Sequence, residues 1–143
     1  MQIFYNLLHI KPNELFIGKA FDSKLGLIIR SPLSSGILAG KYDHHTRFNN
    51  EDDRSRFLYG QTLASRVDAV NKITEYFKLS SEYSISHLSL NYLLSNDKIS
   101  TIIPGISRDS QLQDILKLCE IKRLSLKQSC ELEDFVKENF VEK

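Results

Sequence analysis

The amino-acid sequence predicts an α/β fold in which short parallel strands are connected through helices. Three apolar stretches have the composition of buried strands, namely Gln2–Asn6, Gly26–Arg30 and Ser100–Pro104. The intervening segments repeat apolar residues at the helical spacing of three and four positions. The first two strands flank a helical segment, which is the order of a βαβ unit, and such units are almost always right-handed.

Composition sets broad limits on the class of protein. The 143 residues suffice for a single domain over 1–143, and 41% hydrophobic and 26% charged residues are ordinary for a globular chain. A net charge of +1 predicts neither a nucleic-acid nor a membrane partner. Cys119 and Cys130 have no metal-type spacing, and no apolar run approaches the ~20 residues of a membrane span. We therefore expect a soluble, cytoplasmic protein without a metal site.

The first helix is expected to follow the amino-terminal strand. Pro12 suits a first helical turn, and Gly26 is expected to end the segment before the second strand. The apolar residues predicted to pack inward are Leu15, Phe16, Ala20 and Phe21.

The second strand leads into a loop suited to an anion. Leu27–Ile29 is apolar on both faces, and Pro32 cannot donate to a sheet ladder. After it come Ser34, Ser35, Gly36 and Lys41, which offer free amides, hydroxyls and a cation. Such a loop at the carboxyl end of a strand can wrap an anionic ligand. An ordinary strand-to-helix connection fits the same features equally well.

A long polar loop and two helices precede the last strand. The loop 43–60 is long enough to be functional or mobile, but His44 and His45 have no third spaced metal ligand. One helix is predicted by the stripe Leu63, Val67, Val70, Ile73 and Phe77. Ser84 is expected to cap the next helix, with His87 structural and with Leu88, Tyr92 and Leu93 inward.

The last strand, Ile99–Ile103, stops at Pro104-Gly105, and Ser107 is expected to cap a helix over Asp109–Cys119. Free amides at such a helix start, together with Arg108, favour a phosphate. A capped helix with a surface arginine is the alternative.

Ser125 and Gln128 form a capping box for a final helix. Its inward residues are expected to be Leu132, Phe135, Val136 and Phe140.

Three stretches resemble the aldo-keto reductase family in order and spacing. Arg30-Ser-Pro-Leu-x-x-Gly-x-Leu-x-Gly-Lys-Tyr42 resembles the loop after the seventh barrel strand. Gln2-Ile-Phe-Tyr-Asn-Leu-Leu8 resembles the sixth strand, and Thr101-Ile-Ile-Pro-Gly-Ile-Ser-Arg-Asp-Ser-Gln-Leu112 resembles the eighth strand and its cofactor turn. The resemblance covers only the second half of the family. It implies a partial TIM (β/α)8 barrel of about three βα units plus extra carboxyl-terminal helices.

The resemblance also implies a site for NADPH, which this half alone would bind weakly if at all. Gln2 would contact the nicotinamide carboxamide. An arginine of the long loop would cover the pyrophosphate, and Arg56 rather than Arg54 is the candidate for this role. Ser107 and Arg108 would grip the 2′-phosphate, and Gln111 and Asp114 would touch the adenine, although Ile115 replaces the usual Asn. The implied cofactor residues are Gln2, Arg30, Ser31, Pro32, Leu33, Ser35, Gly36, Lys41, Arg56, Gly105, Ser107, Arg108, Gln111 and Asp114.

No residue matches the Tyr, Lys, Asp and His tetrad with which this family reduces carbonyl groups. Tyr5, Tyr42 and Tyr59 have no adjacent Lys–Asp pair that could lower a tyrosine pKa. Two hypotheses follow. The chain is the cofactor-binding half of an oxidoreductase, inactive alone and completed by a first-half chain or within a homo-oligomer. Alternatively, it is a non-catalytic remnant or interaction module with weak nucleotide affinity.

Overall fold

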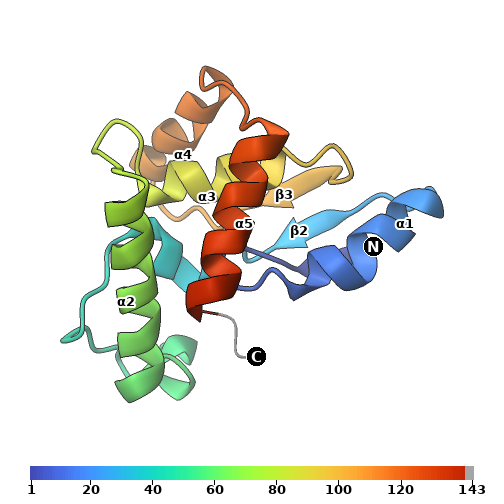
Figure 1. Ribbon diagram of the computed structural model, residues 1–143. Coiled ribbons are helices and arrows are strands. Elements are labelled where there is room, and N and C mark those ends of the chain that lie inside the picture. The colour runs from blue at the N-terminus through green and yellow to red at the C-terminus, as the bar shows by residue number, and fades with distance from the viewer. Residues whose placement is uncertain (141–143) are drawn as a thin grey trace.

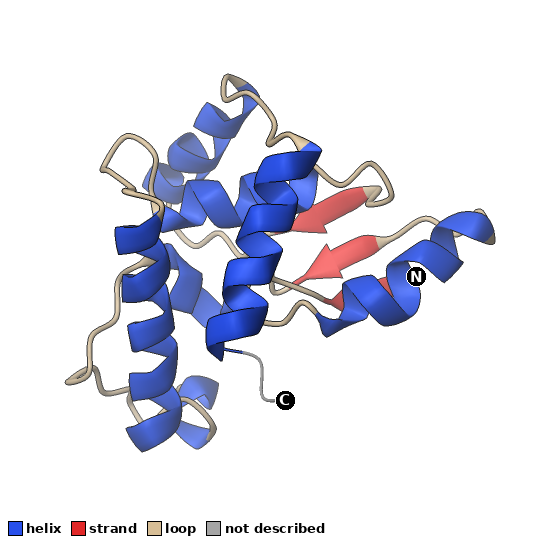
Figure 2. Cartoon of the chain, in the orientation of Figure 1, coloured by secondary structure: helices blue, strands red, loops and turns tan. Residues whose placement is uncertain are grey.

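Three short parallel strands form the sheet. A computed structural model describes residues 1–140, without the side chains of Asn13 and Glu14. The strands β1 (Gln2–Phe4), β2 (Ile28–Arg30) and β3 (Thr101–Ile103) pair in the order β1-β2-β3 (Figure 2). Their register aligns Ile3 with Ile29 and Ile29 with Ile102. The three predicted parallel strands are thus confirmed, each shorter than its apolar stretch.

Helices connect the strands and extend beyond them (Figure 1). After β1, a π-helical turn η1 (Asn13–Ile17) continues into α1 (Gly18–Asp22). Helices α2 (Gly60–Tyr76) and α3 (Ile85–Leu94) separate β2 from β3, and α4 (Asp109–Leu116) and α5 (Leu126–Phe140) follow β3. Short 3₁₀ segments are η2 (Ser34–Ala39), η3 (Asp53–Arg56) and η4 (Lys117–Cys119). None of the helices in this described part is long and apolar enough to cross a membrane.

The hydrophobic core lies on the helix-covered face of the sheet. Ile29 at its centre is fully buried, and Ile3 and Ile102 pack against the same cluster. The predicted inward residues of the three long helices are confirmed. Those that are buried are Leu63, Val67, Val70, Ile73, Leu88, Tyr92, Leu93, Leu132 and Val136, while Phe77, Phe135 and Phe140 are partly buried against them. The capping boxes at Ser84 and Ser125 are also present.

The prediction for the first helix was wrong for three of its four inward residues. Leu15, Phe16 and Phe21 are about half exposed, whereas Ala20 is buried as predicted and Ile17 is buried with it. The π-helical turn widens the helix and rotates the residues that follow it, so the 3.6-residue pattern does not apply here.

Two predicted helix ends are also corrected. Helix α1 ends at Asp22, before Gly26, because Lys24 adopts a left-handed φ of 56° there. The Leu25 amide donates to the Ala20 carbonyl (2.9 Å), which completes a Schellman-type cap. Ser107 does not cap α4, since Arg108 is the N-cap residue and the Ser107 amide and hydroxyl both donate to the Gln111 side chain (2.9 and 3.1 Å).

Candidate functional site

A cavity of about 520 Å³ lies at the carboxyl ends of β2 and β3. We call it the loop cavity, because the loops after these two strands form its walls. Its lining residues are Arg30, Ser31, Pro32, Leu33, Ser35, Gly36, Ala39, Lys41, Tyr42, Arg54, Ile103, Gly105, Ser107 and Gln111. Most of the residues implied as cofactor contacts are therefore brought together in one place.

The loop after β2 has an unusual backbone. Ser34, Ser35 and Gly36 adopt successive positive φ angles of 49°, 56° and 93°, and Ser31 has a φ of 53°. Non-glycine residues rarely occupy this region, and strained backbone of this kind clusters at functional sites. Two tight turns hold the loop, from the Ser34 amide to the Ser31 carbonyl (3.0 Å) and from the Gly36 amide to the Leu33 carbonyl (2.9 Å).

The loop cavity is lined by cations. Arg30, Lys41 and Arg54 face it, and none of its lining residues among 1–140 is acidic. The Arg30 guanidinium lies 5.1 Å from the centre of the Phe4 ring. Cations together with a backbone turn at the carboxyl end of parallel strands are suited to an anionic ligand.

A carboxylate behind the cavity wall positions Arg54. Asp52 accepts hydrogen bonds from the Arg54 Nε (2.9 Å to Oδ1) and from its Nη2 (2.5 Å to Oδ2), and Arg54 Nη1 donates to the Tyr42 hydroxyl (2.5 Å). These bonds lower the pKa of Asp52 to about 2, and the same bond to Asp52 raises the pKa of Arg54. Arg54 is thus a fixed, fully charged group at the cavity wall.

Four of the implied cofactor residues lie outside the loop cavity. Gln2 begins β1, level with Ile28, so it lies at the amino end of the sheet and not on the carboxyl side where it was expected. Arg56 is exposed, pairs with Asp53 (3.1 Å) and is not among the lining residues. Arg108 is exposed at the start of α4, and its side chain has no partner among the described residues.

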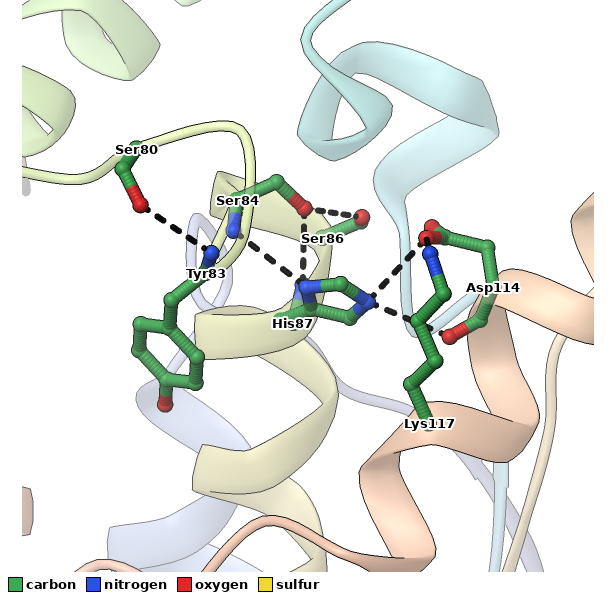
Figure 3. A network of polar contacts seen from close by, with 7 residues as sticks. All are labelled: Ser80, Tyr83, Ser84, Ser86, His87, Asp114 and Lys117. Atoms are coloured by element: carbon green, nitrogen blue, oxygen red, sulfur yellow. Dashed lines mark hydrogen bonds and ion pairs between the residues drawn. The ribbon is translucent and has the colours of Figure 1, made fainter.

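Asp114, the fourth residue, belongs to a polar network between α3 and α4 (Figure 3). Nδ1 of the buried His87 accepts from the Ser84 amide (3.3 Å), so the proton is assigned to Nε2. Nε2 donates to the Asp114 carbonyl (3.1 Å) and lies 3.3 Å from its carboxylate. Lys117 Nζ is also 3.3 Å from that carboxylate. His87 is structural, as predicted, because it caps α3 and anchors α4.

Sequence reasoning missed two groups that shape the site. The position of Arg56, before an aromatic residue and the next helix, favours it over Arg54, but Arg54 is the arginine that lines the loop cavity. Asn6 is fully buried, and its side-chain amide donates to the Ser31 carbonyl (3.1 Å) while its oxygen accepts from the Leu8 amide (3.0 Å). A polar residue inside an apolar strand motif was the available signal for Asn6.

Histidine and acidic residues form no metal site in the described part of the chain. His44 instead contacts Asp68 (2.8 Å), so the polar loop is tied to α2.

The fold is that of one part of a (β/α)8 barrel. The glycerol dehydrogenase from Gluconobacter oxydans matches 96% of this chain with a TM-score of 0.76 and 16% identity. An aldo-keto reductase from Bacillus halodurans matches 99% of this chain with a TM-score of 0.65 and 18% identity. The matched region is only 42% and 44% of those two chains, so the expected partial barrel is confirmed.

The chain belongs to the Aldo/keto reductase family, whose model matches residues 1–137. An Arabidopsis thaliana protein named "Probable voltage-gated potassium channel subunit beta" is 29% identical over 102 residues, and the match covers 68% of this chain. The L-glyceraldehyde 3-phosphate reductase of Escherichia coli K12 is 23% identical over 120 residues, which is 80% of this chain. The chain spans 30% and 34% of the length of these two relatives.

Proposed function

We propose that this chain is the cofactor-binding, carboxyl-terminal half of an NADPH-dependent aldo-keto reductase. In this role it is inactive alone, and a first-half chain supplies the general acid for carbonyl reduction in trans. The observation that carries the proposal is the loop cavity, where residues from separate sequence motifs form one cationic site beside a strained backbone turn.

The residues present fit a dinucleotide phosphate. The turn at Ser35 and Gly36, with Lys41, would face the pyrophosphate, and Arg54 would take the role first considered for Arg56. Arg108 at the start of α4 is free to reach the 2′-phosphate, where helix amides also favour an anion. NADPH, when bound, would supply hydride to the carbonyl carbon.

The contacts of Tyr5, Tyr42 and Tyr92 do not suit a general acid for that reaction. Burial raises the pKa of Tyr5 and of Tyr92, whose hydroxyls bond to each other (2.5 Å), and Tyr92 also donates to Glu133 (2.6 Å). The Tyr42 hydroxyl accepts from Arg54. We therefore expect the purified chain not to oxidise NADPH with any aldehyde or ketone. Turnover that survives repurification and is abolished by a substitution in this chain would contradict this expectation.

Cofactor binding is tested separately by fluorescence titration with NADPH. We expect weak binding, with NADPH preferred to NADH. Arg54→Gln should weaken it roughly ten- to a hundredfold, because a charge-assisted hydrogen bond contributes about 1.5–3 kcal/mol. Arg56→Gln is the matched control and should have little effect. Equal losses in the two variants, or no binding to the wild-type chain, would remove the proposed role of the loop cavity.

Complementation decides between this proposal and the non-catalytic alternative. Co-expression with the first half of a barrel from a family member should give NADPH oxidation that neither half shows alone. If the two halves form a stable complex that still lacks activity, the chain is an interaction module.

A further inference from the structure

A second cavity, of about 550 Å³, lies beside the loop cavity and is distinct from it. Its walls come from the turn after β1, from the η2 segment, from α2 and from the end of α5. The lining residues are Phe4, Leu8, His9, Ser34, Gln61, Ser65, Arg66, Asp68, Ala69, Lys72, Asn139 and Phe140. We call it the basic cavity, because Arg66, Lys72 and His9 all line it.

The position of Arg66 is fixed within the basic cavity. Its Nη1 donates to the hydroxyl of Ser34 (3.3 Å), a residue that is 2% exposed, so the guanidinium is tied across from α2 to η2. His9 packs edge-on against Phe4, with the ring centres 5.0 Å apart. Lys72 lies over the Phe140 ring at 5.8 Å.

Negative charge in the basic cavity is limited. Asp68 is the one acidic residue among its described lining residues, and its carboxylate contacts the His44 ring at 2.8 Å. Partial burial, followed by the charges of Arg66 and Lys11, lowers the pKa of His9. The His9 ring therefore lies in a positive field, which a bound anion would offset.

We propose that the basic cavity binds the phosphate group of a small phosphate monoester, at a site separate from that of the dinucleotide. A planar guanidinium, an ammonium group and an imidazole together match a dianion with several acceptor oxygens. The serine backbone turn is shared by the two cavities, since Ser34 lines one and Ser35 the other. If the proposed reductase function holds, the natural ligand is a phosphorylated carbonyl substrate. This identification of the ligand rests on the proposed function, whereas the binding of a phosphate group does not.

The test uses the full chain and the ring resonances of His9 in NMR spectra, assigned with a His9→Gln variant. Inorganic phosphate and glycerol 3-phosphate should each shift these resonances in a saturable way and raise the pKa of His9. Arg66→Gln should weaken that binding about ten- to a hundredfold. Arg66→Lys, which keeps the charge, should lose less, and Arg54→Gln, in the loop cavity, should leave it unchanged.

The possible outcomes separate this site from the cofactor site. If NADPH shifts the His9 resonances and the small phosphates do not, the basic cavity belongs to the dinucleotide and the proposal is wrong. A response that Arg54→Gln abolishes and Arg66→Gln does not would also overturn it. If the small phosphates bind through Arg66 while NADPH binds nowhere, this inference holds and the proposed function fails.

Discussion

At the scale of single residues, we predict that Arg108 gives the proposed cofactor site its preference for NADPH over NADH. It is exposed at the helix start and has no partner among the described residues, so no internal contact must be broken to engage a phosphate. Arg108→Ala should reduce NADPH affinity roughly ten- to a hundredfold and leave NADH affinity almost unchanged, because NADH lacks the 2′-phosphate. Titration with both nucleotides measures this, and equal losses for the two would contradict it.

His87 is a residue whose role is stability rather than ligand binding. It completes the capping box of α3 and donates to Asp114 on α4. His87→Ala should lower the free energy of unfolding by about 1–3 kcal/mol, because it leaves the Ser84 amide without its acceptor and removes the hydrogen bond from His87 to the Asp114 carbonyl. Urea unfolding measures the loss.

A glutamine at the same position separates the two contacts of His87. His87→Gln keeps a side-chain acceptor suited to a capping box, so we expect a smaller loss than for alanine. If glutamine and alanine cost the same, the contact with α4 is the more important one. An alanine variant as stable as the wild type would show that neither contact matters.

At the scale of the element, the turn after β2 depends on one glycine. Gly36 has a φ of 93°, and a Cβ added there would lie 2.7 Å from the Tyr42 hydroxyl oxygen. Gly36→Ala should therefore cost about 1–3 kcal/mol of stability, because it combines left-handed backbone strain with a close contact. It should also weaken NADPH binding, since Tyr42 and Arg54 would have to move.

Gly105 is the matched control for this substitution. It lines the same loop cavity, but a Cβ there meets nothing within 4 Å and its φ is not in the left-handed range. Gly105→Ala should change the urea midpoint little. A loss as large as that of Gly36→Ala would mean that the cavity wall is sensitive to any added methyl group, and the argument from φ would fail.

At the scale of the whole molecule, the face of the sheet that would line the barrel interior is poorly covered. Ile28 and Ile103 on that face are 37% and 48% exposed. The continuous segment η1–α1 and helix α4 lie on opposite sides of the molecule (Figure 1), and each exposes apolar residues. These are Leu15, Phe16 and Phe21 beside β1 and Leu112 and Leu116 after β3. In addition, the outer edges of β1 and β3 have no strand partner among the described residues.

These surfaces predict association, with a first-half chain or with another copy. Full burial of one such side chain contributes about 1.5–3 kcal/mol. Burial of all these exposed apolar side chains would therefore contribute a free energy comparable with the roughly 5–15 kcal/mol that stabilises a domain. Sedimentation at micromolar concentration should show dimers or larger species. Ile28→Lys with Ile103→Lys should reduce them, whereas Leu126→Lys, at an 82% exposed position on α5, should not. A wild-type monomer that melts cooperatively would contradict the prediction.

The sequence by itself determined the parallel strands, the inward faces of the three long helices and the motifs that form the loop cavity. These features depend on local periodicity, on capping residues and on a contiguous loop, and such signals are present in the order of the residues. The helix spacing of Leu63, Val67, Val70 and Ile73 was sufficient to identify their buried face.

Only the tertiary structure decided which polar groups meet. Contacts with Asp52 and Tyr42 place Arg54, and not Arg56, at the wall of the loop cavity. The strand register places Gln2 at the amino end of the sheet, outside that cavity. His87 holds Asp114 in the network between α3 and α4. The exposed face of η1 and α1 depends on a π-helical turn that apolar spacing did not indicate. Each of these outcomes results from a long-range contact or a backbone deviation, and local sequence patterns do not encode either one.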